Sequence, residues 1–100
     1  MQKQIEFDFV DKEKNRLIND YNLTINQDGY ILNPGKFEGE RLTTIYFYDA
    51  FLNGDGEYID DAVQEFQITK EDIAIFPELA GYKTFTLGFL DNGFVFGYPT

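Results

Sequence analysis

Eighteen of the 100 residues are Phe or Tyr and none is Cys, so large apolar side chains rather than disulfides must stabilise the fold. A chain of this length has room for about one small domain. Its aromatic content also separates it from acidic disordered tails, which contain few such residues. We therefore expect residues 1–100 to form a single folded domain.

Short segments with alternating or β-prone residues favour antiparallel strands. Charged and apolar residues alternate over Gln4–Val10, which predicts a half-buried strand, and the β-branched and aromatic run Arg41–Tyr48 predicts a central strand. Leu23–Ile25 and Tyr30–Leu32 flank an Asp-Gly turn and predict a hairpin that pairs Leu23 with Leu32 and Ile25 with Tyr30. Residues 83–98 predict a second hairpin around an Asp-Asn-Gly turn.

The remaining segments are shorter or ambiguous. Asp11–Asp20 fits either a short helix or a charged loop, and Ile59–Phe66 has helical spacing that runs into an alternating pattern, which predicts one helical turn before a strand. Thr69 and Asp72 are spaced as the N-cap and third residue of a short helix that Pro77 would end. Together the patterns predict an α+β domain, mainly antiparallel β, with about five to six short strands and one or two short helices.

The chain contains no Cys, His, Ser or Trp, which removes most nucleophiles and most bases that work near neutral pH. Transition-metal sites need thiolate or imidazole ligands, and a calcium loop starting at Asn53 fails because Tyr58 and Gln64 occupy its glycine and glutamate positions. The glycines form no nucleotide-binding motif. We therefore predict no enzyme activity, no metal site and no cofactor. The enzymatic alternative is a pair of carboxylates, which would need an enclosed pocket.

The charge is strongly negative and unevenly distributed. Six basic residues face eight acidic ones in the first 45 positions, whereas two face ten in the rest, for a net charge of −10. Such a surface repels phosphates and anionic lipids, so we expect no direct contact with nucleic acid or membrane. The chain also shows no signal-peptide pattern and no apolar run of about 20 residues, which predicts a cytoplasmic location, the host cytoplasm if the chain is phage-encoded.

The strongest indication of a binding surface is the segment from Asp49 to Glu65, which holds six acids and no basic residue. Tyr and Phe side chains lie within or beside it, and Tyr is favoured at protein interfaces. A surface of one charge also accelerates encounter with an oppositely charged partner. The alternative is that the acids form a solvated face and the aromatic residues belong to the core. The predicted partner-binding residues are Asp49, Asp55, Glu57, Tyr58, Asp60, Asp61 and Glu65.

The sequence therefore predicts a non-catalytic, acidic inhibitor that docks on a basic, nucleic-acid-handling protein. Mimicry of DNA or RNA is a sharper form of this hypothesis. Duplex DNA carries one charge per about 1.7 Å, whereas acids on one strand lie about 6.6 Å apart, so a mimic needs acids from at least two adjacent elements. In size, acidity and aromatic content the chain resembles small phage and mobile-element inhibitors, anti-CRISPR proteins among them, although it shares no motif with them. The alternative is a structural subunit that forms homo-oligomers or joins a phage-like particle through exposed strand edges.

Overall fold

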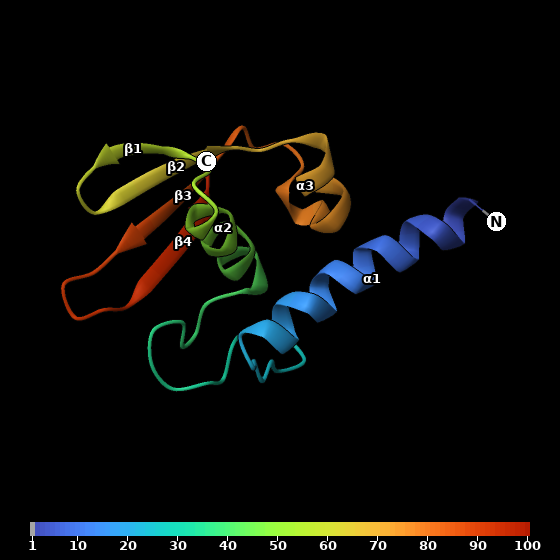
Figure 1. Ribbon diagram of the computed structural model, residues 1–100, viewed down its shortest axis with the longest axis horizontal. Helices are drawn as coiled ribbons and strands as arrows, with labels where there is room; N and C mark the ends of the chain where they lie inside the picture. The colour runs from blue at the N-terminus through green and yellow to red at the C-terminus, as the bar shows by residue number, and fades with distance from the viewer. Residues whose placement is uncertain (1) are drawn as a thin grey trace.

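The computed structural model describes the backbone of residues 2–100 and the side chains of residues 9–100. A four-stranded antiparallel sheet has the order β1-β2-β3-β4, and two hairpins supply its strands. Figure 1 shows α2 beside the sheet and α1 extending away from it toward the N-terminus. The elements are α1 (Gln2–Asp20), α2 (Leu42–Leu52), β1 (Glu57–Asp60), β2 (Val63–Gln67), α3 (Lys70–Ile75), the 3₁₀ helix η1 (Pro77–Leu79), β3 (Thr84–Phe89) and β4 (Val95–Pro99).

The predicted α+β class with an antiparallel sheet is confirmed, but the predicted number of strands is wrong. The described residues form four strands and three α-helices instead of five to six strands and one or two helices. The missing strands belong to the first half of the chain, where α1 and α2 replace two of them and the first predicted hairpin forms only isolated bridges.

The strand predicted over Gln4–Val10 is wrong because the backbone of this segment belongs to α1. The good helix formers of α1 flank this segment, since Gln2 and Lys3 precede it and Lys12, Glu13 and Lys14 follow it. Further along α1, Val10, Lys14, Leu17 and Ile18 follow helical spacing. Leu17 is fully buried, and the Lys14 ammonium lies 5.2 Å from the centre of the Phe76 ring. Asp11–Asp20, left open between helix and loop, is therefore helical.

The central strand predicted over Arg41–Tyr48 is also wrong, since Leu42–Leu52 forms α2. Its β-branched and aromatic residues are tolerated because the helix is surrounded by protein on several sides, and packing outweighs intrinsic preference there. Thr44, Ile45 and Phe47 are all buried. The helix therefore occupies the centre of the molecule that the sequence had assigned to a strand.

Two further predictions fail in their details. Residues 59–66 contain no helical turn, because β1 and β2 form a hairpin there. The first predicted hairpin is reduced to isolated bridges, one of which pairs Ile25 with Ile31, so Leu23/Leu32 and Ile25/Tyr30 are not the observed pairs. A second bridge joins Tyr30 to Arg41, which ties this irregular loop to the start of α2.

Two local predictions are confirmed. Thr69 caps α3: its side chain accepts a hydrogen bond from the Asp72 amide, and Asp72 accepts one from the Thr69 amide in return. Residues 83–98 form the β3–β4 hairpin. The two patterns depend mainly on residues close in sequence, which explains why they can be identified without the rest of the fold.

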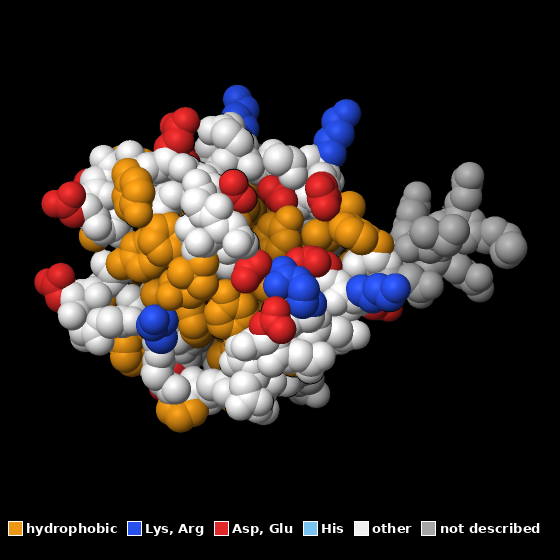
Figure 2. Space-filling model, in the orientation of Figure 1, with side chains coloured by type: hydrophobic (Ala, Val, Ile, Leu, Met, Phe, Trp, Pro, Cys, Tyr) orange, Lys and Arg blue, Asp and Glu red, His pale blue; other side chains and the backbone are white. Residues whose placement is uncertain are grey.

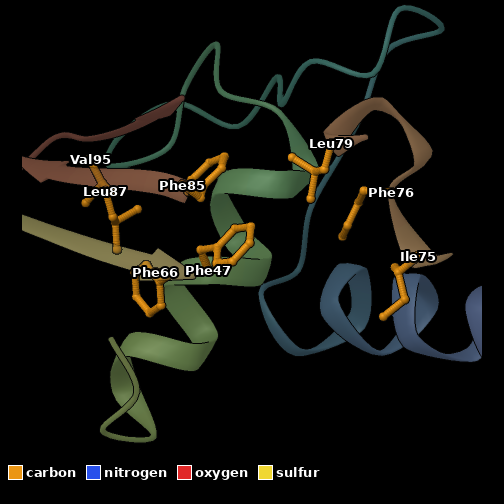
Figure 3. Packing of buried hydrophobic residues seen from close by; sticks show 8 residues of the cluster. All are labelled: Phe47, Phe66, Ile75, Phe76, Leu79, Phe85, Leu87 and Val95. Carbon is orange, nitrogen blue, oxygen red and sulfur yellow. The ribbon is translucent and has the colours of Figure 1, made fainter. Parts of the chain in front are cut away.

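The main core lies where α2 meets the sheet. Phe47 of α2 stacks on Phe85 of β3, with ring centres 4.2 Å apart, and contacts Phe66 of β2 at 5.3 Å. Figure 3 shows Phe47 between the strands and the residues of α3 and η1. A smaller cluster joins α1 to α2, with Leu17 and Ile45 both fully buried. The aromatic core thus fixes α2 against the sheet, which positions the site described below.

Candidate functional site

The structure brings most of the predicted partner-binding residues together but leaves Asp49 apart. Asp55 and Glu57, with Tyr58, Asp60 and Asp61, lie on the loop after α2, on β1 and in the following turn, and all are exposed. Glu65 lies on the neighbouring β2. We call this segment, residues 55–65, the acidic hairpin. It contains six of the seven predicted residues.

Asp49 is used inside the molecule. One of its oxygens accepts a hydrogen bond from Arg16 at 3.0 Å and the other accepts one from the Tyr21 hydroxyl, also at 3.0 Å. Arg16 also pairs with Glu13 and Asp20. The hydrogen bond to Glu13, followed by that to Asp49, raises the pKa of Arg16, while burial and the bond to Asp49 raise the pKa of Tyr21. Asp49 therefore ties α2 to α1.

The acidic hairpin carries its charge on two adjacent strands and on the turn between them. Asp60 accepts a hydrogen bond from the Ala62 amide at 2.7 Å, which shapes the turn between the strands. Glu57 of β1 lies directly opposite Glu65 of β2. Side chains of directly opposed residues project from the same face of a sheet, and like charges in such pairs are destabilising. Two adjacent strands therefore contribute acids to one face.

An aromatic cluster adjoins the acidic hairpin, and we call it the aromatic patch. It consists of Tyr48 and Phe51 of α2, Tyr58 of β1 and Phe89 of β3. Phe51 lies 4.9 Å from Phe89 and 6.3 Å from Tyr58 between ring centres. Tyr58 is 71% exposed, so this part of the patch is open to a partner. Figure 2 shows hydrophobic side chains gathered over α2 and the sheet, with acidic side chains at the tips of both hairpins.

A pocket of about 440 Å³ lies beside the acidic hairpin and was not predicted from the sequence. This volume falls in the range of about 300–1,000 Å³ that is typical of ligand sites. Its apolar wall includes Tyr46, Phe47 and Phe66, and none of the described residues that line it is Lys or Arg. Four acids complete the lining, namely Asp55, Glu57, Glu65 and Asp72.

Asp72 is the buried member of these acids. One of its oxygens accepts a hydrogen bond from the Tyr46 hydroxyl at 2.6 Å, and the other caps α3 through the Thr69 amide at 2.9 Å. Burial, followed by this bond to Asp72, raises the pKa of Tyr46. The capping pattern reveals Asp72 in the sequence, but its partner on α2 lies 26 positions away and no local pattern connects the two. Asp72 therefore helps to hold α3 against α2.

Gly56 forms the wall of the pocket between Asp55 and Glu57. Its φ of +91° is a conformation that glycine adopts at little cost, and a Cβ there would lie 2.7 Å from Cε1 of Phe66. The buried Gln64 supports the same segment, because its amide nitrogen donates to the carbonyl oxygen of Asp55 at 2.7 Å. The loop is thus pressed against the core, with an acid on each side of the glycine.

Other kinds of site find little support in the described part of the chain. No three His, Cys, Asp or Glu residues among residues 9–100 are grouped so that they could hold a metal ion. No helix within residues 2–100 has both the length and the apolar character that crossing a membrane requires. Comparison with protein-family models, with curated proteins and with solved structures found no match. Any function must therefore be argued from the geometry of the chain itself.

Proposed function

We propose that the protein is a non-catalytic, acidic inhibitor that docks on a basic, nucleic-acid-handling protein through the acidic hairpin and the aromatic patch. The observation that carries the proposal is the contact between Phe51 and the exposed Tyr58, which joins the aromatic patch to the acidic hairpin. Aromatic residues supply most of the binding energy at many interfaces, and a charged rim adds speed and selectivity. The two features are complementary parts of one docking surface.

The positions of the acids also support the mimicry hypothesis. A single strand spaces its acids too widely to imitate a nucleic acid, but neighbouring strands lie only about 4.8 Å apart. Glu57 and Glu65 face each other across this interval, and Asp60 and Asp61 extend the charge into the turn. A basic groove that normally holds phosphates is the surface that such a pattern would fit.

A catalytic role is not part of the proposal. A general acid needs a carboxyl group that its surroundings keep protonated. In the pocket, Asp55 and Glu57 are exposed to solvent, and both oxygens of Asp72 accept hydrogen bonds within the fold. We place the inhibitor in the cytoplasm, because it carries no cysteine that would suit it to an oxidising compartment.

The edges of the sheet favour a foreign partner over a second copy of the chain. The outer amides of β4 are already occupied, since Val95 donates to the carbonyl of Lys36 at 2.9 Å and Gly97 donates to Glu40 at 3.0 Å. Pro99, the next outward residue, has no amide hydrogen. At the other edge, pairing β1 with its own copy would bring acids such as Glu57 close together. The assembly-subunit alternative therefore lacks a suitable edge.

Affinity capture from the lysate of the native host tests the proposal. The bait is the wild-type chain or a hairpin variant, Asp55→Asn, Glu57→Gln, Asp60→Asn and Asp61→Asn, which keeps side-chain shape while removing four charges. The control variant removes four exposed acids elsewhere, Asp11→Asn, Asp28→Asn, Glu38→Gln and Glu78→Gln.

Wild type and the control variant should retain a basic protein at low salt and release most of it at high salt, whereas the hairpin variant should retain much less. Equal recovery with the hairpin variant and the wild type would remove the proposal. Circular dichroism of all three baits verifies that the fold is preserved.

A further inference from the structure

The two faces of the sheet differ, because α2 packs on one of them. Figure 3 shows Phe66, Phe85 and Leu87 on the side of α2. Successive side chains of a strand point to opposite faces, so the other side, which we call the open face, is formed by Glu57, Val63, Glu65, Thr86, Phe96 and Tyr98. We propose that the open face binds an arginine side chain of the partner protein. This inference rests on the proposed function and adds the chemistry that the partner must present.

The strand register arranges the open face in two rows. One row crosses the four strands in the order Glu57, Glu65, Thr86 and Tyr98. The next row consists of Val63, Gly88 and Phe96. Tyr98 is 47% exposed, Glu57 is exposed, and Glu65 and Phe96 are half-buried. Neither row contains Lys or Arg, so the open face has an acidic end on β1 and β2 and an aromatic end on β4.

Two parallel rings cover the aromatic end of the open face. The far edge of the Phe96 ring occupies the place of a side chain at Gly88, since a Cβ there would lie 2.1 Å from Cζ of Phe96. The Tyr98 ring is parallel to it within 5°, with ring centres 6.1 Å apart, close to the spacing of alternate residues on a strand. Both rings therefore lean from β4 across β3, which explains why Thr86 is only 7% exposed. The lean brings the Tyr98 ring toward Glu65.

The two ends of the open face together suit a guanidinium. The side chains of Glu57 and Glu65 project side by side, because the residues are directly opposed on strands that lie about 4.8 Å apart. A guanidinium carries its donors in a planar fork, so it can reach both carboxylates while its plane or its methylene stem rests on the Tyr98 ring. Lysine supplies a point charge without a plane that can stack. The open face therefore favours arginine.

Charge argues against two other occupants of an aromatic sheet face. Bases of single-stranded nucleic acid also stack on such rings, but Glu57 and Glu65 would repel their phosphates. A second copy of the chain would bring the same acids of two molecules together, each with a net charge of −10. Light scattering at several concentrations should therefore give a monomer. A dimer that Tyr98→Leu abolishes would assign the open face to a second copy and overturn the inference.

A titration of the whole chain with a blocked Gly-Arg-Gly peptide, followed by amide chemical shifts in NMR spectra, tests the inference. The shifts should be largest at residues 57, 65, 86 and 96–98 and small at residues 46–50 of α2, on the other side of the sheet. The citrulline peptide has nearly the same shape without the charge, so it should bind about fivefold more weakly. Equal binding of the citrulline peptide, or largest shifts away from the open face, would overturn the inference.

Variants of Tyr98 test the aromatic end. Tyr98→Leu removes the ring and should weaken the arginine peptide about two- to fivefold, whereas Tyr98→Phe keeps the ring and should bind like wild type. The control is Tyr30→Leu, which removes a tyrosine of similar exposure, 41%, from the loop before α2. Circular dichroism verifies that each variant keeps the fold. Equal binding by Tyr98→Leu and Tyr30→Leu would contradict stacking on the open face.

A pair of charge variants tests the acidic end. Glu57→Gln with Glu65→Gln removes both carboxylates of the open face and should weaken the arginine peptide about fivefold or more. The control, Asp28→Asn with Glu38→Gln, removes the same charge from two exposed residues outside the acidic hairpin and should change binding less than about twofold. Equal losses in the two variants would show that net charge alone attracts the peptide, which would overturn the inference.

The two proposals can fail separately, because Tyr98 belongs neither to the acidic hairpin nor to the aromatic patch. With Tyr98→Leu as the bait, capture of the basic protein from the host lysate should fall below that with Tyr30→Leu. If the two baits recover the same amount while capture still depends on the hairpin charges, only the arginine inference is wrong. If the arginine peptide binds the open face but capture does not depend on the hairpin charges, the proposed function is wrong.

Discussion

Replacing Gly56 with Ala should destabilise the protein more than the same substitution at Gly54, two residues earlier. Both glycines have a positive φ, +91° and +86°, where an alanine costs about 1–2 kcal/mol. They differ in their surroundings. A Cβ at Gly54 meets nothing within 4 Å, whereas one at Gly56 would lie 2.7 Å from Phe66 and 2.8 Å from Gln64. The comparison therefore isolates the close packing of the pocket wall from the backbone conformation.

The extra cost at Gly56 follows from overpacking. Forcing a methyl group into a packed site costs typically about 1–3 kcal/mol, so the free energy of unfolding should fall by about 2–5 kcal/mol for Gly56→Ala and about 1–2 kcal/mol for Gly54→Ala. In a domain of this size each kcal/mol lowers Tm by about 4–8 °C. Urea unfolding followed by far-ultraviolet circular dichroism measures both variants. Equal midpoints would refute the packing of this loop against Phe66.

Three further predictions concern the same region. Asp72→Ala should cost about 2–4 kcal/mol in urea unfolding, because two hydrogen bonds to a carboxylate are lost, whereas the exposed neighbour Glu71→Ala should change stability by less than about 0.5 kcal/mol. Burial and hydrogen bonding raise the pKa of Tyr46 and Tyr21, so the unfolded chain loses these protons first and stability should fall as the pH rises above about 10. The double Phe variant should lose less stability between pH 9 and 11 than wild type, and an equal loss would contradict the assignment. Glu65→Gln should raise stability by about 0.2–1 kcal/mol, because it removes the like-charge pair across the strands, and a lower urea midpoint would count against that repulsion.

The parts of the fold that the sequence predicts correctly are those decided by local chemistry. The Thr69–Asp72 cap and the hairpin around Asp91 and Gly93 depend on hydrogen bonds and backbone angles within a few residues. The two large errors fall on α1, where an alternating segment lies within a helix, and on α2, where the intrinsic preference of the residues and their packing favour different structures. The run Leu42–Leu52 has the composition of a strand but forms a helix, because it is packed against both the sheet and α1.

The candidate site, like the fold, could be predicted from the sequence only where its residues are close together in the chain. The acids of residues 55–65 are neighbours in sequence, so their concentration is visible without a structure. Asp49 belongs to the same run, yet a contact with Arg16, 33 positions earlier, directs it toward α1 and away from the acidic hairpin. The pocket depends on α2, β2 and α3 meeting around Gly56, and contacts of this kind leave no periodic signal in the sequence.

The salt dependence of binding tests the central claim most directly. The measurement is the affinity of the captured basic protein for wild type, the hairpin variant and the control variant over a series of NaCl concentrations. If the acidic hairpin is the docking surface, affinity for wild type and the control variant should fall steeply and in parallel as salt rises, while the hairpin variant should bind weakly with a shallower slope. The same slope and affinity for both variants would show that the charge of the whole molecule, and not this surface, governs the interaction.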